Sequence, residues 1–240
     1  MKLNITNQTA VEKEVLHIYA ANKPTSFDLL QKSISEKKFQ LFLKRSFDVI
    51  VSLLLILIFS PILLTVALII KLTSRGPILY SNERVGHGGH HFKCHKFRSM
   101  VTDHSVKHDD HKRHLENAEK GLLHKEKNDT RITWIGKIIR KTSIDELPQL
   151  FNVFLGDMSI VGPRPLVPFM LTPYPEFRNI RCLVRPGITG LWQIRDRENN
   201  TSAEFMIKHD TEYVENYTLL LDIKILAETP VVVISGKGAY

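Results

Sequence analysis

The sequence predicts an α-rich α+β fold, in which a re-entrant membrane helix hairpin broken at a Ser-Pro pair precedes a loop-rich domain with interfacial amphipathic helices. Three observations lead to this prediction: an uncharged apolar run interrupted by proline, glycine- and proline-rich turns through the middle of the chain, and helical periodicity in the tail. We divide the chain into a polar N-terminal extension (1–41), the membrane helix (42–73) and the remaining domain (74–240).

Composition and charge narrow the classes of partner. With 43% hydrophobic residues the chain can bury a core, and its two cysteines, Cys94 and Cys182, fit a reducing compartment rather than a disulfide framework. A formal net charge of +8 favours partners that carry negative charge. Aromatic residues are too sparse to form a stacking platform among the basic residues, so we expect no nucleic acid, and favour phosphorylated substrates or membrane lipids.

The membrane prediction rests on residues 49–70, which form an uncharged apolar run. As a helix, this run is long enough to cross the ~30 Å hydrocarbon core of a bilayer. The polar extension before it lacks the apolar stretch of a signal peptide, so we do not expect a cleavable leader.

Two features argue against a straight span. The Ser60-Pro61 pair lies at the centre of the run, where proline removes a backbone donor, so the helix must kink or break and Ser60 can satisfy a freed carbonyl. Basic residues flank both ends, Lys44-Arg45 before and Lys71 and Arg75 after, so both ends are predicted to face the cytoplasm. A single span and a fully buried soluble hairpin remain as alternatives.

The elements beyond the membrane helix follow from turn residues and periodicity. Residues 74–100 predict loops with a short strand or hairpin, and residues 103–127 predict a charged, solvated or interfacial helix. Two further helices are predicted over 132–141 and 144–155, before a turn-rich stretch at 156–165.

The tail from about Ser202 to Ile234 predicts helix, interrupted at Pro230. Its larger apolar side chains either seek the membrane interface or pack in the core, and the sequence leaves both interpretations open. These side chains are Phe205, Tyr213, Tyr217 and Leu219–Leu221.

The segment from Arg140 to Pro165 carries the predicted chemistry. Ser143 and Glu146 have capping-box spacing, which predicts a helix beginning close to Ser143 and puts Asp145 and Glu146 in its first turn, where negative charge is favoured. Ordinary helix capping explains these acidic residues equally completely.

Two arginines distinguish the segment from ordinary capping. Arg140 lies one turn before the carboxylates, and Arg164 is fixed between Pro163 and Pro165, where its planar side chain can grip a phosphate. Paired carboxylates that can hold Mg²⁺, together with fixed cations, are what metal-assisted phosphoryl transfer requires.

Several long motifs now identify a family resemblance over about residues 42–240. The motifs are KRSFDVIVS with the Ser60-Pro61 break, SRGPILYSNERVG, KFRSM, DTRITWIGKIIRKTSIDELPQLFNVFLGDMSIVGPRP, RPGITGLWQI and the closing GKGAY. In this order they resemble the monotopic phosphoglycosyl transferase family, the bacterial polyprenyl-phosphate sugar phosphotransferases, in its small form.

The resemblance implies a re-entrant helix in the bacterial inner membrane, a catalytic domain on the cytoplasmic face, and Mg²⁺ bound at an acidic dyad that falls on Asp145 and Glu146. Asp145 would attack the sugar-linked phosphate of a UDP-sugar and release UMP, before undecaprenyl phosphate takes the phosphosugar. Glu146 would bind Mg²⁺ or handle the proton. Such a reaction is the first membrane step in making an exopolysaccharide, an O-antigen or a glycoprotein.

The resemblance also implies residues that hold the substrates. They are Arg140 and Arg164 for phosphate, and, near the nucleotide, Lys96 and Arg98 of KFRSM and Arg185 and Gly187 of RPGITG. The sugar is not readable from the sequence, because specificity comes from a pocket assembled from distant loops. Oligomeric state is also left open, with a homo-oligomer as one option.

A histidine-rich stretch competes with this interpretation. Nine of the eleven histidines lie between His87 and His124: four surround Cys94, and His104, His108 and His111 share one face of the predicted helix. These residues either fill a polar loop and helix or bind a transition metal, which would suit a non-catalytic scaffold. A third hypothesis is a membrane glycosyltransferase that moves the sugar without its phosphate and releases UDP.

Overall fold

The computed structural model describes residues 27–101, 131–195 and 203–234. Its helices are α2 (Phe27–Glu36), α3 (Lys38–Thr73), α5 (Trp134–Lys141), α6 (Gln149–Leu155), α7 (Pro168–Leu171), α8 (Pro175–Arg181), α9 (Leu191–Arg195), α10 (Ala203–Glu215) and α11 (Leu219–Ile234). Its strands are β1 (Leu79–Val85), β2 (His91–Phe97), β3 (Ser159–Val161) and β4 (Gly187–Thr189), with single 3-10 turns η1 (His87–Gly89) and η2 (Ile144–Glu146). The α-rich prediction is confirmed, whereas the predicted helix over 103–127 lies outside these ranges.

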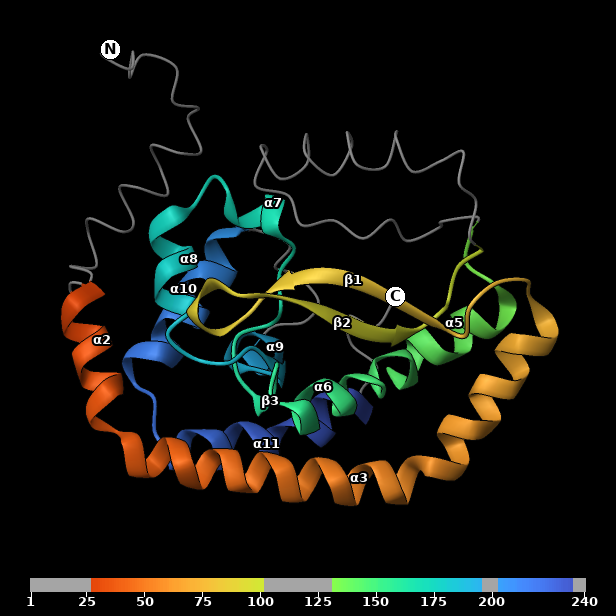
Figure 1. Ribbon diagram of the computed structural model, residues 1–240, viewed down its shortest axis with the longest axis horizontal. Helices are drawn as coiled ribbons and strands as arrows, with labels where there is room; N and C mark the ends of the chain where they lie inside the picture. The colour runs from red at the N-terminus through yellow and green to blue at the C-terminus, as the bar shows by residue number, and fades with distance from the viewer. Residues whose placement is uncertain (1–26, 102–130, 196–202, 235–240) are drawn as a thin grey trace, which may run out of the picture.

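Helix α3 runs unbroken through the apolar stretch and bends on the way, as Figure 1 shows. Pro61 lies inside the helix and cannot donate to the carbonyl of Leu57, four residues earlier. The Ser60 Oγ donates to that carbonyl instead, at 2.8 Å, as predicted. Of the predicted kink or break, the structure therefore shows a bend within one continuous helix, because the neighbouring serine replaces the hydrogen bond that the proline cannot make. Re-entry into the membrane stays a prediction.

The middle of α3 exposes its apolar side chains. Only 11% of its most apolar window is buried, and Leu57, Ile58 and Leu64 are each more than half exposed. Of the helices described, α3 is the one that is long and apolar enough to cross a membrane, by length and composition. The alternative of a fully buried soluble hairpin is wrong, because such a helix would bury this surface in the core.

Both ends of α3 are fastened to the rest of the protein. Towards its N-terminal end, the buried Asp48 carboxylate accepts hydrogen bonds from the Ser159 hydroxyl and the Ile160 N–H, each at 3.0 Å. At the other end, the Arg98 guanidinium donates to the carbonyl and the hydroxyl of Ser74, each at 2.8 Å. The domain thus lies along one side of the helix and holds it at two places (Figure 1).

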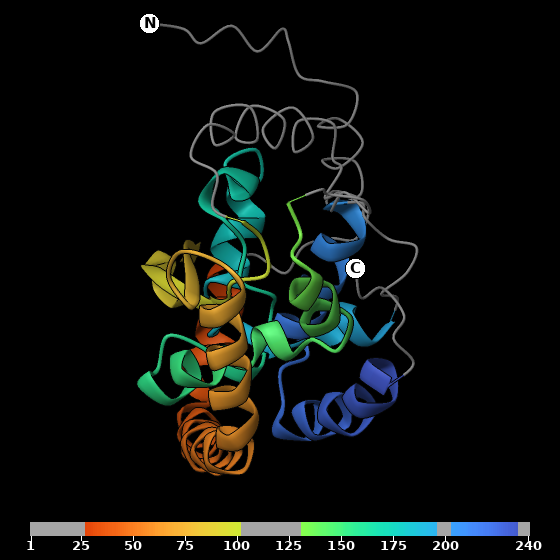
Figure 2. The same ribbon diagram turned by 90° about the vertical axis from the view of Figure 1, so that its right-hand side faces the viewer.

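The described part of the domain contains two small, two-stranded sheets. Strands β1 and β2 form the antiparallel hairpin predicted within 74–100, paired from Leu79 with Phe97 to Val85 with His91. Strands β3 and β4 are parallel, with Ser159 opposite Gly187 and Val161 opposite Thr189. In Figures 1 and 2, α11 and the first part of α3 lie along the lower edge of the molecule, whereas α3 beyond its bend rises along one side of the domain.

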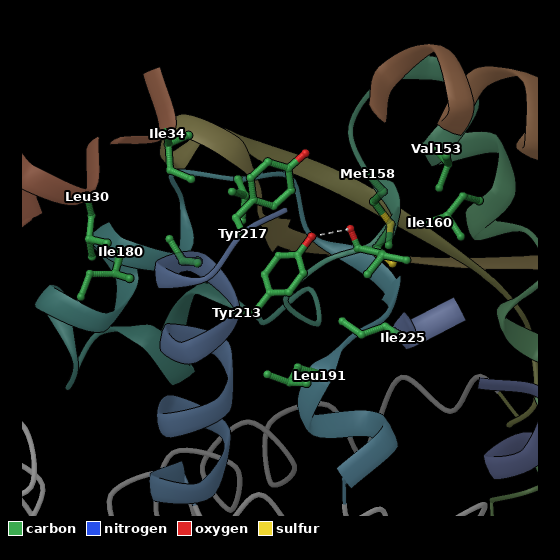
Figure 3. Close-up of a cluster of buried hydrophobic side chains, with 14 of the residues drawn as sticks. Leu30, Ile34, Val153, Met158, Ile160, Ile180, Leu191, Tyr213, Tyr217 and Ile225 are labelled. Atoms are coloured by element: carbon green, nitrogen blue, oxygen red, sulfur yellow. Dashed lines mark hydrogen bonds between the residues drawn. The ribbon is translucent and has the colours of Figure 1, made fainter. Parts of the chain in front are cut away.

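The main core gathers around α10. Tyr213 and Tyr217 are both fully buried, and Figure 3 shows their rings among aliphatic side chains from several other elements. Core packing is therefore the correct interpretation for these two tyrosines of the tail, and the interface-seeking one is wrong. Leu30 and Ile34 of α2 belong to the same core, so the second part of the predicted polar extension packs as part of the folded domain.

Candidate functional site

The acidic dyad lies in η2, a single turn between α5 and α6. Ser143 has φ 57°, a left-handed conformation that differs from the extended one of a side-chain cap, and its hydroxyl caps nothing. Helix α6 begins only at Gln149, directly after Pro148. The predicted capping box is therefore wrong. A helical turn does begin directly after Ser143, but it is the single 3-10 turn η2, which carries Asp145 and Glu146, both half-buried, ahead of α6.

Glu146 is the centre of a charged cluster built from three parts of the chain. Its Oε1 accepts from the Lys96 Nζ of β2 at 2.6 Å and from the Arg164 Nη2 of the GPRP loop at 2.8 Å. All three side chains are largely withdrawn from water, with exposed fractions of 13% for Glu146, 20% for Lys96 and 21% for Arg164. Charge-assisted hydrogen bonds in such surroundings are strong and directional.

The electrostatics tie Asp145 to the same cluster. The Glu146 carboxylate is the main cause that raises the pKa of Arg164 above its usual value, against the opposing effect of burial, and Asp145 adds to the rise. Of the predicted residues, the structure therefore brings together Asp145, Glu146, Arg164 and Lys96. Arg140 lies half-buried in the last turn of α5, which packs against η2.

Close backbone packing positions the loop that carries Arg164. The Gly187 N–H donates to the Pro163 carbonyl at 2.8 Å, and a Cβ at Gly187 would lie 2.1 Å from the backbone nitrogen of Gly162. Arg181 donates from beneath to the carbonyl of Arg164 itself. Gly187 is thus needed because β4 touches the GPRP loop backbone to backbone. Its expected place near the nucleotide stays a prediction.

Arg84 is a site residue that sequence reasoning missed. It donates to the Pro165 carbonyl at 3.3 Å and to Asn82 Oδ1 at 3.2 Å, and burial is the main cause that lowers its pKa. Arg164 and Glu146 are close enough to shift that pKa as well. Strand periodicity could have found it, because Asn82 and Arg84 lie on the same face of β1 as Tyr80, whose partner in β2 is Lys96.

Two predicted substrate residues lie elsewhere. Arg98 is almost fully buried and binds the last turn of α3 through Ser74, and Arg185 Nε donates to the Gly156 carbonyl at 2.9 Å, just beyond the end of α6. Cations at helix C-termini stabilise the helix by satisfying its last carbonyls. Arg98 and Arg185 therefore support helix ends, and their expected place near the nucleotide stays a prediction.

A cavity of about 280 Å³ borders the dyad turn on the side of the membrane helix. Ser143 and Glu146 belong to its wall, and most of the rest of the wall is aliphatic or aromatic. The lining residues are Leu55, Phe59, Ser143, Glu146, Leu147, Leu150, Ile160, Ile188, Thr189, Gln193, Ile194, Leu226, Thr229, Pro230 and Val232.

The donor groups at and near the dyad limit which metal ion the site could hold. Over residues 27–101, 131–195 and 203–234, no three His, Cys, Asp or Glu side chains gather as a metal cluster. His91 pairs with Glu83 and His95 with the Ser81 hydroxyl, so the described histidines near Cys94 do not converge on one centre. His104, His108 and His111 lie outside the described residues. Two adjacent carboxylates suit Mg²⁺, which completes its shell with water and substrate phosphate.

Comparison with known proteins identifies the family of this chain. The family described as bacterial sugar transferase matches residues 39–236. The undecaprenyl-phosphate galactose phosphotransferase of Salmonella typhimurium is 44% identical over 207 residues, which cover 85% of this chain and 43% of that protein. The exopolysaccharide production protein ExoY of Rhizobium meliloti is 40% identical over 199 residues, which cover 82% of this chain and 88% of that protein.

A third relative, the UDP-glucose:undecaprenyl-phosphate glucose-1-phosphate transferase of Klebsiella pneumoniae, is 39% identical over 207 residues, covering 82% of this chain and 41% of that protein. The chain spans less than half the length of the Salmonella and Klebsiella proteins and most of the length of ExoY. Because the family model matches most of the chain and these identities are high, the chain belongs to the bacterial sugar transferase family, which includes undecaprenyl-phosphate sugar phosphotransferases.

Proposed function

We propose that the protein transfers a sugar 1-phosphate from a UDP-sugar to undecaprenyl phosphate through a covalent aspartyl-phosphosugar intermediate, with release of UMP. The observation that carries the proposal is the dyad turn, where Asp145 stands beside a Glu146 carboxylate held by Lys96 and Arg164. The names of the Salmonella and Klebsiella relatives supply the pair of substrates. The reaction would begin the assembly of a glycan at the membrane.

In the first step, a carboxylate oxygen of Asp145 attacks the phosphorus that carries the sugar. A new bond forms between that oxygen and phosphorus, and the anhydride bond to the UMP phosphate breaks, so UMP leaves with the bond's electron pair. The nearby cations Lys96, Arg84 and Arg164 stabilise the negative charge that builds up on the phosphoryl oxygens.

In the second step, a phosphate oxygen of undecaprenyl phosphate attacks the same phosphorus. The bond to Asp145 breaks, its carboxylate is restored, and the lipid carries the sugar through a diphosphate. Both steps exchange one phosphorus–oxygen bond for another, so no oxidant or reductant is required. Because Glu146 shares Lys96 and Arg164 with the incoming phosphates, it orients these two cations for either substrate.

Mg²⁺ would bind at Asp145 and Glu146, and it would supply charge neutralisation for the phosphates when bound. The support for this assignment is the donor set, which consists of two adjacent carboxylates on a half-buried turn. One Glu146 oxygen already accepts from two cations, so Glu146 brings little net negative charge to the metal. Asp145 is then the residue on which Mg²⁺ affinity should chiefly depend.

We further propose that α3 enters and leaves the inner membrane on its cytoplasmic face, so that the dyad works at headgroup height. Support comes from the exposed apolar middle of the helix, from the bend, and from the attachment of both ends to one domain. Basic residues at both ends fit a common cytoplasmic side. This placement lets a water-soluble donor and a lipid acceptor reach the same carboxylate.

The direct test incubates the full-length protein in vesicles with undecaprenyl phosphate, Mg²⁺ and a panel of UDP-sugars, and identifies the nucleotide that is released. UMP is the expected product, and UDP would instead identify a glycosyltransferase that moves the sugar without its phosphate. Asp145→Asn should abolish turnover, whereas the same change at the exposed Asp28 should leave it intact. Full activity of Asp145→Asn would contradict the proposal and favour the scaffold hypothesis.

A further inference from the structure

The cavity beside the dyad is closed on one side by the membrane helix itself. Leu55 and Phe59 of α3 form part of its wall, opposite residues of α11 that include Leu226 and Pro230. We propose that this cavity is the acceptor-chain pocket, which holds the phosphate-proximal prenyl units of the lipid acceptor and leaves the phosphate beside Glu146. The assignment rests on the proposed function and adds the residues that select the acceptor.

The polarity of the wall fits an apolar chain with an anionic head. The hydroxyls of Thr189 and Thr229 bond to each other at 2.9 Å, and Thr229 also donates to the Ile225 carbonyl, so both turn their polar atoms to protein partners. The Gln193 Nε2 donates to the Ile188 carbonyl at 3.2 Å, so the Gln193 Oε1 is the one amide atom of this side chain without a protein partner. Among the described residues that line the wall, Glu146 alone is charged, and its partners Lys96 and Arg164 can attract the lipid phosphate.

The position of the pocket fits a ligand that arrives from the bilayer. Only 11% of the apolar window of α3 is buried, and α11 exposes Leu220, Ile223 and Val231, so the two helices that flank the pocket both present apolar surface outward. The first part of α3 and α11 both lie at the lower edge of the molecule in Figures 1 and 2. A prenyl chain could therefore leave the pocket into lipid without crossing water.

The size of the pocket limits what it holds. Ligand sites that enclose a drug-sized molecule measure roughly 300–1,000 Å³, so 280 Å³ suits a short part of a long chain, with the remainder in the membrane. Because lipid tails are as apolar as the pocket, moving the chain between them gains little hydrophobic free energy. The pocket's contribution is then alignment of the phosphate with the phosphorylated Asp145.

The donor is the competing occupant. A sugar or a uracil ring carries several hydrogen-bonding groups, and burial against aliphatic walls would leave these groups without partners at a considerable cost. The aliphatic residues Leu226, Ile188 and Ile194 offer them none. The wall thus favours the acceptor, and the experiment below separates the two substrates.

The test fills the pocket from α11. Leu226→Trp places a larger ring in the cavity, and Ile223→Trp, on an exposed face of the same helix, is the matched control. Full-length variants in vesicles are assayed for two half-reactions: the burst of UMP from UDP-sugar without acceptor, and transfer to undecaprenyl phosphate. The second assay is repeated with a short, two-unit prenyl phosphate.

Leu226→Trp is expected to raise the KM for undecaprenyl phosphate about tenfold and the KM for the short acceptor less, while the UMP burst and the donor KM stay within about twofold of wild type. Ile223→Trp should change none of these values. If Leu226→Trp raises the donor KM or removes the burst, the pocket serves the donor. If neither substrate responds, the cavity is only a packing space, and both results overturn the proposal.

A milder variant guards against loss of folding. Leu226→Phe should give a smaller shift in the same acceptor KM, with a thermal midpoint close to that of wild type. Failure of the proposed function itself would look different, because wild type would then release no UMP with any UDP-sugar.

Discussion

Lys44 of α3 and Asp222 of α11 form a buried ion pair, with Nζ 2.6 Å from Oδ2. The Tyr213 hydroxyl donates to the other Asp222 oxygen at 2.7 Å, so this carboxylate joins the membrane helix, the core helix α10 and the helix that flanks the acceptor-chain pocket. Burial raises the pKa of Asp222, and Lys44 opposes that rise.

Removing this carboxylate should destabilise the protein strongly. Asp222→Ala leaves the Lys44 ammonium buried without its partner, and breaking a buried pair in this way costs about 3–5 kcal/mol. We expect a clear fall in the thermal midpoint of the purified protein, whereas Asp28→Ala on the exposed face of α2 should change it little. Equal midpoints for the two variants would show that the pair adds no stability.

The shared carboxylate predicts coupling between Lys96 and Arg164. Each cation bonds to the same Glu146 oxygen, so Lys96→Met and Arg164→Met should each lower kcat/KM by about 10²-fold or more, as losses of phosphate-stabilising groups do. The double variant should lose less than the product of the two factors, because residues in one network are not additive.

Lys93 provides the control for this cycle, since it lies on the opposite, exposed face of strand β2. Lys93→Met should keep kcat/KM within about twofold of wild type, in the range expected for surface substitutions. Strict multiplicativity of the Lys96 and Arg164 effects in the same assay would contradict a shared role for Glu146.

The parts of the structure that the sequence predicted depend on periodic patterns. The apolar run 49–70 and the turns around residues 86–89 predicted α3 and the β1–β2 hairpin, because these signals lie in neighbouring residues. The donor Ser60 was also predictable, since the carbonyl that proline frees lies one turn away.

The parts that the sequence did not predict depend on contacts between distant segments. The left-handed conformation of Ser143 ruled out the capping box, although the residue types matched it. Arg84, Lys96 and Arg164 meet only because the hairpin folds against the GPRP loop, and Arg98 bonds to the end of α3, 24 residues earlier in the chain. Lys96 and Arg98 lie in the same motif, KFRSM, and no local pattern could tell which of them joins the charged cluster around Glu146.

The buried carboxylate of Asp210 predicts a pH dependence of the protein's stability. Burial raises the pKa of Asp210 to about 7, although Arg181 lies 3.4 Å away and lowers it. In the unfolded chain the same group titrates near its usual 3.8, so between these values the folded state holds a proton that the unfolded state has lost. The stability from this group is present below about pH 4 and is lost as the pH rises to 7.

In wild type, titration of this group can add at most about 1.4 kcal/mol per pH unit to the fall of the unfolding free energy between pH 4 and 7. Asp210→Asn removes this titration and should therefore make the fall shallower. The measurement is the thermal midpoint against pH for wild type and variant. Parallel stability curves for both proteins would contradict the assignment.

The bend of α3 predicts a topology that labelling can check. If the helix re-enters, single cysteines introduced at Lys38 and Arg75, in a Cys94→Ser, Cys182→Ser background, should both react with a membrane-impermeant maleimide only from the cytoplasmic side. Pro61→Ala restores the missing backbone donor and should straighten the helix, which favours a full span and exposes one of the two sites outside. Ser60→Ala serves as the control, because it keeps the proline and loses only the bond to Leu57. Labelling of the two ends from opposite sides in the Pro61-containing protein would exclude re-entry and leave the single span.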